Sequence, residues 1–210
     1  MEDFVVESGE GGRGLLVVPG ISSGPFGSPF DEVADGFDGA VVRVDAWEGA
    51  GDLEEMTLED LHGLVQEGVG LLENEGCESV AVLGKSFGGQ LALTCPDVSF
   101  DCMVLWAPAV GFGEDNVEKW RSTLLDKAST ATDISIGAER LENVDASVHI
   151  FHGTGDEVVG VDNSRKIVKA LQDSDLTVVE NTGHSFSGRE AELADQSVRE
   201  LNKVGQSSAK

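Results

Sequence analysis

The sequence has no tyrosine, only three cysteines, and 14 lysines and arginines among its 210 residues. Cys77, Cys95 and Cys102 form no C-x-x-C pair and accompany no histidine cluster, which argues against a disulfide framework and a zinc site. No apolar run approaches the roughly 20 residues that cross a bilayer. The start, Met1-Glu2-Asp3, lacks the basic and apolar layout of a signal peptide. We therefore expect a soluble cytoplasmic protein with reduced cysteines and no membrane partner.

Basic residues are scarce, whereas Asp and Glu number 39, so the formal net charge at pH 7 is −25. This charge repels phosphate backbones, and no local basic patch offsets it, which excludes nucleic acid as a partner. Low lysine, no tyrosine and abundant Asp, Glu, Gly and Val resemble the composition of proteins from salt-in halophilic archaea. At high salt, screening suppresses the self-repulsion that would destabilise such a chain in dilute buffer.

Apolar runs indicate the fold class. With 40% hydrophobic residues, the length suits a single α/β domain over 1–210, with 205–210 as a frayed tail. Six short runs are rich in Val, Leu and Ile without alternation, which is typical of strands buried on both faces of a parallel sheet. They are residues 15–18, 40–44, 80–83, 103–106, 148–151 and 176–179, and residues 4–6 would add an edge strand.

Helical periodicity appears between these runs. Residues 58–73 carry one apolar stripe at a period near 3.6, and Thr57 with Asp60 gives an N-cap signal. Residues 161–171 and 190–204 behave similarly. The alternation predicts a doubly wound, mostly parallel α/β sheet of about six or seven strands. Ligands bind beyond the carboxyl ends of strands in such sheets, so the residues that follow each run are the site candidates.

The strongest motif follows the run at 80–83. Gly84-Lys85-Ser86-Phe87-Gly88 is a G-x-S-x-G pattern between a predicted strand and a predicted helix start at 90–93. A turn this tight lifts the Ser86 hydroxyl above the sheet, beside a helix N-terminus that favours negative charge. Ser86 is therefore the candidate nucleophile.

A serine nucleophile needs a base and an orienting acid. Among the four histidines, we expect His62 to be a surface or boundary residue and His149 to be partly buried in a strand. His184 follows the run at 176–179 at the correct sheet edge, and Asp156 follows the run at 148–151 in a Gly-flanked loop. Glu157 is the nearest competitor but would point away if Asp156 points inward. The order Ser, Asp, His is the one that this fold requires.

Together these residues make the sequence resemble the α/β-hydrolase superfamily, and within it the small cap-poor members related to dienelactone hydrolase. The resemblance covers nearly the whole chain and rests on Val18-Pro19-Gly20, the Ser86 turn, Trp106-Ala107-Pro108, residues 152–159 and Gly183-His184-Ser185-Phe186. It implies an oxyanion hole formed by the backbone N–H groups of Phe87 and Ile21 (or Ser22), and a structural role for His152. Pro19 departs from the family, which usually has histidine there, and this puts the second oxyanion donor in question.

We expect a serine hydrolase that cleaves a small ester or thioester through an acyl-enzyme, without cofactor or metal. Trp106, Phe112 and Lys85 are candidates for binding the small-molecule substrate, with Lys85 favouring an anionic one, and a helix at 115–127 would form a small lid. Two alternatives stay open: a catalytically silent binding or scaffold protein, and a peptidase or acyltransferase on the same fold. The intact Ser, Asp and His set argues against the first. The sequence carries no signal for an oligomeric state.

Overall fold

The computed structural model describes residues 3–53, 56–110, 141 and 143–203, and its centre is a seven-stranded sheet in the order β1-β3-β2-β4-β5-β6-β7. β1 runs antiparallel to β3, and the other neighbouring pairs are parallel. The strands are β1 (Phe4–Glu7), β2 (Arg13–Val18), β3 (Ala40–Val44), β4 (Ser79–Lys85), β5 (Cys102–Trp106), β6 (Ser147–Gly153) and β7 (Ser174–Val179). The predicted mostly parallel sheet is confirmed, and its edge strand β1 is the antiparallel one.

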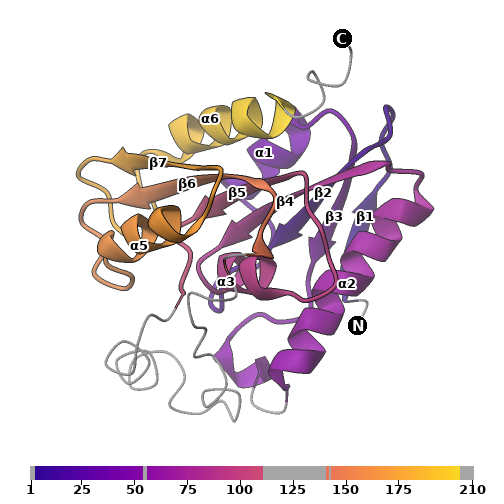
Figure 1. The fold of residues 1–210 in the computed structure, drawn as a ribbon, viewed down its shortest axis with the longest axis horizontal. Coiled ribbons are helices and arrows are strands. Elements are labelled where there is room, and N and C mark those ends of the chain that lie inside the picture. The colour runs from indigo at the N-terminus through magenta and orange to yellow at the C-terminus, as the bar shows by residue number, and fades with distance from the viewer. Residues whose placement is uncertain (1–2, 54–55, 111–140, 142, 204–210) are drawn as a thin grey trace.

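Helices cover both faces of the sheet (Figure 1). On one face lie α2 (Leu58–Asn74), α3 (Phe87–Thr94) and α5 (Asp162–Ala170), and on the other lie α1 (Phe30–Gly36) and α6 (Glu190–Lys203). A short 3₁₀ turn, η1 (Ala50–Leu53), precedes α2. Each face has its own apolar core, because successive side chains of each strand point to opposite sides. No described helix combines the length and apolar character that crossing a membrane requires.

Local sequence explains α2 but not α1. The Thr57 side chain accepts the Asp60 N–H while the Asp60 carboxylate accepts the Thr57 N–H, so the predicted N-cap is a complete capping box. α1 begins after Pro29, which provides no side-chain cap, and spans only seven residues. It forms because Phe30 and Val33 are buried in the core below it. We did not predict this helix, since its signal lies in tertiary packing.

One buried cation holds the loop between β2 and α1. Arg43 on β3 is only 4% exposed, and its guanidinium bonds to Glu7 at 2.7 Å, Asp31 at 2.8 Å and the Pro25 carbonyl at 2.9 Å. A buried guanidinium is tolerated when its donors are satisfied in this way. The contacts fasten β1 and the loop over residues 25–31 to the sheet, next to the carboxyl end of β2.

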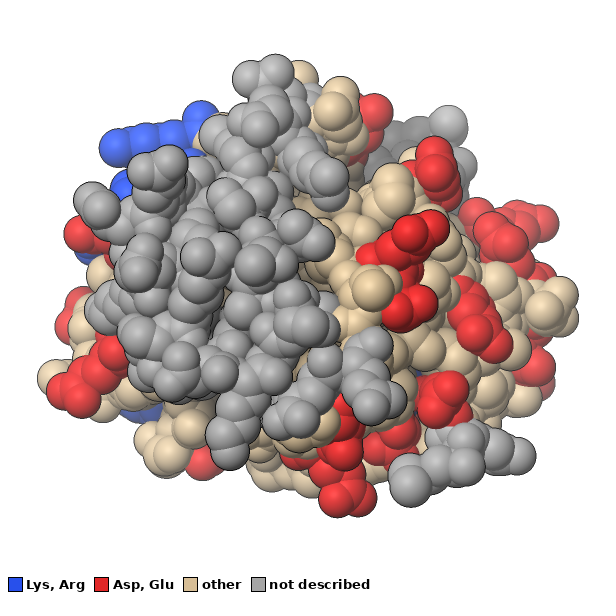
Figure 2. Space-filling model, turned by 90° about the horizontal axis from the view of Figure 1, so that it is seen from below, with Lys and Arg blue, Asp and Glu red and all other residues tan. Residues whose placement is uncertain are grey.

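Most of the other charged side chains that the structure describes lie on the surface. Figure 2 shows one face, where acidic side chains are distributed over the described surface and the few basic ones gather at one side. Like charges at this density repel one another in dilute buffer, and the repulsion extends over a Debye length of about 10 Å at 0.1 M salt. The adaptation to high salt that the composition suggests stays a prediction.

We expect the free energy of unfolding to rise when KCl is raised from about 0.1 M to about 3 M, because the Debye length then falls below about 3 Å. Urea unfolding followed by tryptophan fluorescence measures this, since urea adds no charge. The control is a variant that loses four exposed carboxylates, none of which forms an ion pair within the described residues: Glu32→Gln, Asp35→Asn, Glu59→Gln and Glu67→Gln. With less charge repulsion to screen, this variant should reach its full stability at a lower KCl concentration. Equal salt responses of the two proteins would contradict this explanation.

Candidate active site

Ser86 occupies a strained turn between β4 and α3. Its φ of 52° and ψ of −111° lie where a non-glycine residue is unfavourable by about 1–3 kcal/mol. The turn can form because glycines flank it. A Cβ on Gly88 would stand 2.1 Å from the Val18 carbonyl oxygen, and one on Gly84 would stand 2.7 Å from the Gly89 Cα. The glycines of the predicted motif are therefore a packing requirement.

Backbone hydrogen bonds hold Ser86 in this conformation. Its N–H donates to the Trp106 carbonyl at 2.8 Å, and its carbonyl accepts from Gln90 at 3.1 Å and from Ala109 at 3.0 Å. Three neighbouring segments thus determine the conformation that the residue itself disfavours. Ser86 is 7% exposed and lies at the N-terminal end of α3.

His184 and Asp156 meet in the loops after β7 and β6. Nδ1 of His184 lies 2.7 Å from Oδ2 of Asp156, whose side chain is fully buried, while the His184 side chain is 19% exposed. An ionised carboxylate can only accept, so His184 donates its Nδ1 proton and leaves Nε2 free to accept one. This is the tautomer that a general base requires.

Close backbone contacts hold these two loops together. The Gly155 N–H donates to the Thr182 carbonyl at 2.8 Å, and the Asn181 N–H donates to the Thr154 hydroxyl at 3.0 Å. A Cβ on Gly153 would lie 2.4 Å from the same Thr182 carbonyl oxygen, so glycine is needed for this approach. The loop after β7 is therefore held against the loop that carries Asp156.

The pKa of Asp156 is held well below its ordinary value. Burial opposes its ionisation, but hydrogen bonds from His152 and His184, the charge of His184 and the Val159 N–H outweigh that effect. Oδ1 accepts from the N–H groups of Val158 and Val159 at 2.9 and 2.8 Å. The carboxyl group thus stays ionised although it is buried.

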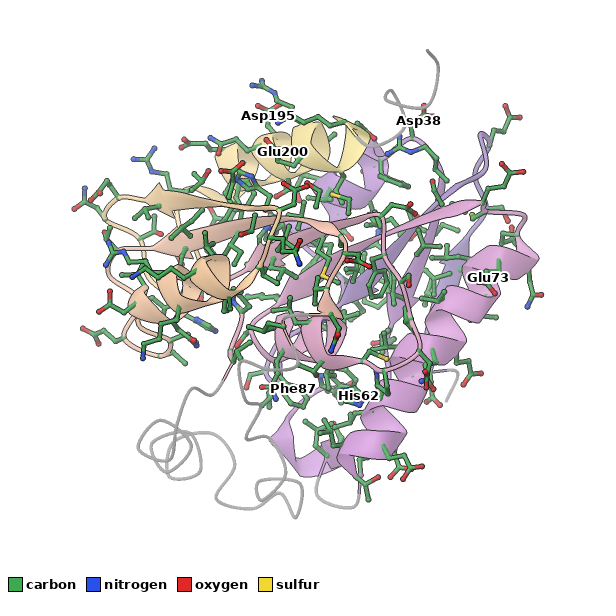
Figure 3. All side chains as sticks on the ribbon, viewed as in Figure 1. Asp38, His62, Glu73, Phe87, Asp195 and Glu200 are labelled. Carbon is green, nitrogen blue, oxygen red and sulfur yellow. The ribbon has the colours of Figure 1, made fainter. Side chains whose placement is uncertain are left out.

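The other histidines have structural partners. His152 is fully buried, with Nε2 2.7 Å from the Val159 carbonyl and 3.3 Å from Asp156 Oδ2, and Nδ1 2.6 Å from the Ser164 hydroxyl. His62, expected at the surface or a boundary, is instead 6% exposed, because α2 packs on α3 and brings its Nε2 to 3.0 Å from the Thr94 hydroxyl. Figure 3 shows His62 and Phe87 in this region.

Ser86 and His184 are brought to the same edge of the sheet, but no hydrogen bond joins them within the described residues. Lys85, next to Ser86, lies close enough to Asp156 for the carboxylate to act on its pKa. Catalytic hydrogen bonds in free enzymes are commonly long and tighten only when substrate binds.

Two backbone N–H groups near Ser86 have no hydrogen-bond acceptor among the described residues. Neither Ile21 nor Phe87 donates a backbone hydrogen bond to any described residue. Phe87 is the first residue of α3, where helical N–H groups lack intrahelical partners. A Cβ on Gly20 would lie 3.5 Å from the Ser86 Cβ, so the turn that carries Ile21 passes directly beside the serine.

Of the candidates for substrate binding, Trp106 lies in the core. Trp106 is fully buried on the face of α1 and α6, against the Phe30 ring at 5.0 Å and with Nε1 3.0 Å from Ser197 Oγ. The expectation that Trp106 lines a substrate pocket is therefore wrong, because its side chain follows the strand alternation into the core. Phe112 lies outside the described residues, as does the predicted helix at 115–127.

Lys85 is half-buried, and its ammonium forms no hydrogen bond or ion pair with any described residue. Burial lowers its pKa, and the attraction of the Asp156 carboxylate opposes that shift. One residue was missed altogether: Trp47, 2% exposed, whose indole N–H donates to the Gly20 carbonyl at 3.0 Å. Its signal was its position just past the carboxyl end of a predicted strand.

A large cavity in the structure lies away from Ser86, Asp156 and His184. A cavity of about 1170 Å³ lies between α2 and the C-terminal half of α3, and its described lining includes none of Ser86, Asp156 and His184. Among the residues described, no three His, Cys, Asp or Glu side chains gather so that they could hold a metal ion.

Comparison with solved structures identifies the fold. The sequence matches no family model and no curated protein. The structure resembles Est1E from Butyrivibrio proteoclasticus (TM-score 0.77, 13% identity, 96% of this chain and 93% of that one). It also resembles a meta-cleavage product hydrolase from Pseudomonas fluorescens (0.70, 15%, 95% and 93%) and mouse alpha/beta hydrolase domain-containing protein 10 (0.72, 15%, 98% and 94%). The protein has the α/β-hydrolase fold.

Proposed function

We propose that this protein is a serine hydrolase that cleaves a small ester or thioester through an acyl-enzyme. The observation that carries the proposal is the His184–Asp156 hydrogen bond of 2.7 Å, which leaves Nε2 of His184 ready to accept a proton at the sheet edge where Ser86 lies. The strained Ser86 turn and the unpaired N–H groups of Ile21 and Phe87 support it.

The proposed cycle has two halves. Oγ of Ser86 attacks the carbonyl carbon while Nε2 of His184 takes the hydroxyl proton, and the N–H groups of Phe87 and Ile21 bind the developing oxyanion. The bond to the leaving oxygen or sulfur breaks as His184 returns the proton to it. Water then adds to the acyl-enzyme with His184 as base, and the acid leaves with Ser86 restored. Asp156 stays ionised and stabilises the imidazolium.

The substrate class rests on the neighbours and on Lys85. One neighbour is described as a lipolytic enzyme, and Est1E has been solved with ferulic acid bound. An ammonium that is half-buried without a partner among the described residues would gain from a substrate anion. We therefore propose an acyl substrate that carries a carboxylate near the scissile bond. Two alternatives are a silent scaffold protein, which the labelling and hydrolysis experiment below separates from an enzyme, and a peptidase or acyltransferase, which a panel of peptide and acyl-acceptor substrates would separate from an esterase.

We expect Ser86→Ala to abolish labelling by a fluorophosphonate probe and to reduce hydrolysis of a short p-nitrophenyl ester by at least about a thousandfold, because the attacking oxygen is lost. His184→Ala should act similarly through loss of the base. The assays belong in molar KCl, with circular dichroism to verify folding and His149→Ala as a control that removes a histidine in a strand. A folded wild-type protein that neither labels nor turns over ester would favour the scaffold alternative.

The variant Asp156→Asn tests the role of Asp156 as orienting acid through the pH dependence of the unfolding free energy. The pKa of Asp156 in the folded protein lies below its ordinary value of 3.8, so its stabilising effect is present above about pH 4 and is lost as pH falls through the folded pKa. The unfolding free energy of wild type minus that of the variant should be constant from about pH 7 to about pH 5 and shrink below about pH 4. Urea unfolding in molar KCl measures it.

At neutral pH the same variant should lose activity by about a thousandfold or more, because an amide does not stabilise the imidazolium or select the Nδ1–H tautomer. Glu157→Gln, the exposed neighbour, is the control and should leave both activity and the pH profile of stability as in wild type. A stability difference that does not change with pH would show that Asp156 lacks the depressed pKa.

Lys85→Met tests the substrate anion. For the p-nitrophenyl monoester of succinic acid, kcat/KM should fall about tenfold, since a charge-assisted hydrogen bond contributes about 1.5–3 kcal/mol. For p-nitrophenyl butyrate, which has a similar length and no free carboxylate, it should change little. Equal changes for both esters would mean that Lys85 does not recognise the acyl anion.

A further inference from the structure

Trp47 joins the two segments that carry the unpaired N–H groups beside Ser86. It lies three residues beyond β3, is 2% exposed, and packs in the same apolar core as Ile21 and Phe87. Its indole N–H donates to the Gly20 carbonyl at 3.0 Å, and its ring meets the Phe87 ring edge-on at 6.3 Å and 70°. Nothing in the proposed cycle uses this side chain directly.

The hydrogen bond to Gly20 also acts on Ile21. The Gly20 carbonyl and the Ile21 N–H belong to one peptide group, which is planar and here trans, so the two bonds point in opposite directions. A donor that holds the carbonyl oxygen on the Trp47 side therefore holds the Ile21 N–H on the other side. A hydrogen bond to the carbonyl also polarises the peptide group and strengthens its N–H as a donor.

The local turn alone holds this peptide group weakly. The Ser23 N–H also reaches the Gly20 carbonyl, but at 3.4 Å, and the Gly20 N–H donates to the Ser23 hydroxyl at 3.2 Å. The Gly20 N–H belongs to the preceding peptide group, so the carbonyl itself accepts two hydrogen bonds from described residues, and the one from Trp47, at 3.0 Å, is the shorter. Because Trp47 also contacts the Phe87 ring, one rigid side chain links the Ile21 and Phe87 segments.

We propose that Trp47 is the positioning residue of the oxyanion hole: it orients the Ile21 N–H through the Gly20 carbonyl and keeps it in register with the Phe87 N–H. The inference rests on the proposed hydrolase function. It also accounts for the second oxyanion donor when Pro19 stands at the position before Gly20, since the orientation comes from Trp47 in the segment after β3 and not from the residues of the turn.

Trp47→Phe is the test, because it keeps an aromatic ring against Phe87 and removes the indole donor. Loss of a whole oxyanion donor costs about 10²–10³ in kcat, and here the donor stays but is less well oriented, so we expect kcat to fall about tenfold with KM within about twofold. Binding of a trifluoromethyl ketone, which forms a tetrahedral adduct with a serine, should weaken by the same factor as kcat/KM.

Ser197→Ala is the matched control. It removes the acceptor of the Trp106 indole N–H, a buried hydrogen bond of the same 3.0 Å length on the opposite face of the sheet. Both variants should lose similar stability in urea unfolding, but only Trp47→Phe should lose kcat and affinity for the ketone. Trp47→Tyr, which also lacks the indole donor, repeats the test if the first variant does not fold.

The outcomes separate the two proposals. If wild type is folded but neither labels nor hydrolyses ester, the hydrolase function fails and the inference with it. If wild type is active and Trp47→Phe keeps its kcat within about twofold, Trp47 has no positioning role. If Ser197→Ala loses as much kcat as Trp47→Phe, the effect is one of general stability and the inference is overturned.

Discussion

Gly88 lies so close to the end of β2 that a Cβ there would stand 2.1 Å from the Val18 carbonyl oxygen. This approach brings the first turn of α3 against the segment that follows β2. As a result, the segment after β2 passes beside Ser86, where a Cβ on Gly20 would lie 3.5 Å from the Ser86 Cβ. The approach is possible because β2 and β4 are neighbours in the sheet, and it brings the Ser86 turn beside the segment whose Gly20 carbonyl accepts the Trp47 indole N–H.

Electrostatics at the site are local although the chain carries a net charge of −25. Burial opposes the ionisation of Asp156 in this acidic protein, but histidine partners within 2.7–3.3 Å outweigh that effect and hold its pKa below the ordinary value. Distant surface carboxylates act through water and are screened beyond a Debye length. Arg43 follows the same rule on β3, where nearby acceptors satisfy a buried guanidinium. Global charge thus bears on solvation and stability, whereas the site depends on its nearest contacts.

The sequence was sufficient to predict those strands and helices that have a continuous apolar pattern or a capping motif. The runs at 40–44 and 103–106 correspond to β3 and β5, and the capping signal at Thr57 marks the start of α2, because these elements follow from periodicity and capping. α1 was not predicted, because its burial comes from contacts with residues that are distant in the sequence. The hydrogen bond of His62 and the burial of Trp106 were not predicted for the same reason. The side of the sheet toward which a side chain points depends on the register of the whole sheet. His184 and Asp156 were foreseeable because topology alone brings the loops after β6 and β7 together.

β5 connects the two halves of the site. Ser86 and the N–H groups of Ile21 and Phe87 belong to the β2–β4 side, while Asp156 and His184 belong to the β6–β7 side. At the end of β5 the Trp106 carbonyl accepts the Ser86 N–H at 2.8 Å, and the next residue, Ala107, donates to the Phe151 carbonyl on β6 at 2.9 Å. A displacement of this strand end would therefore move Ser86 relative to His184 and Asp156. The Trp106 side chain itself lies in the core against the Phe30 ring, so this residue serves the site through its backbone and not through contact with substrate.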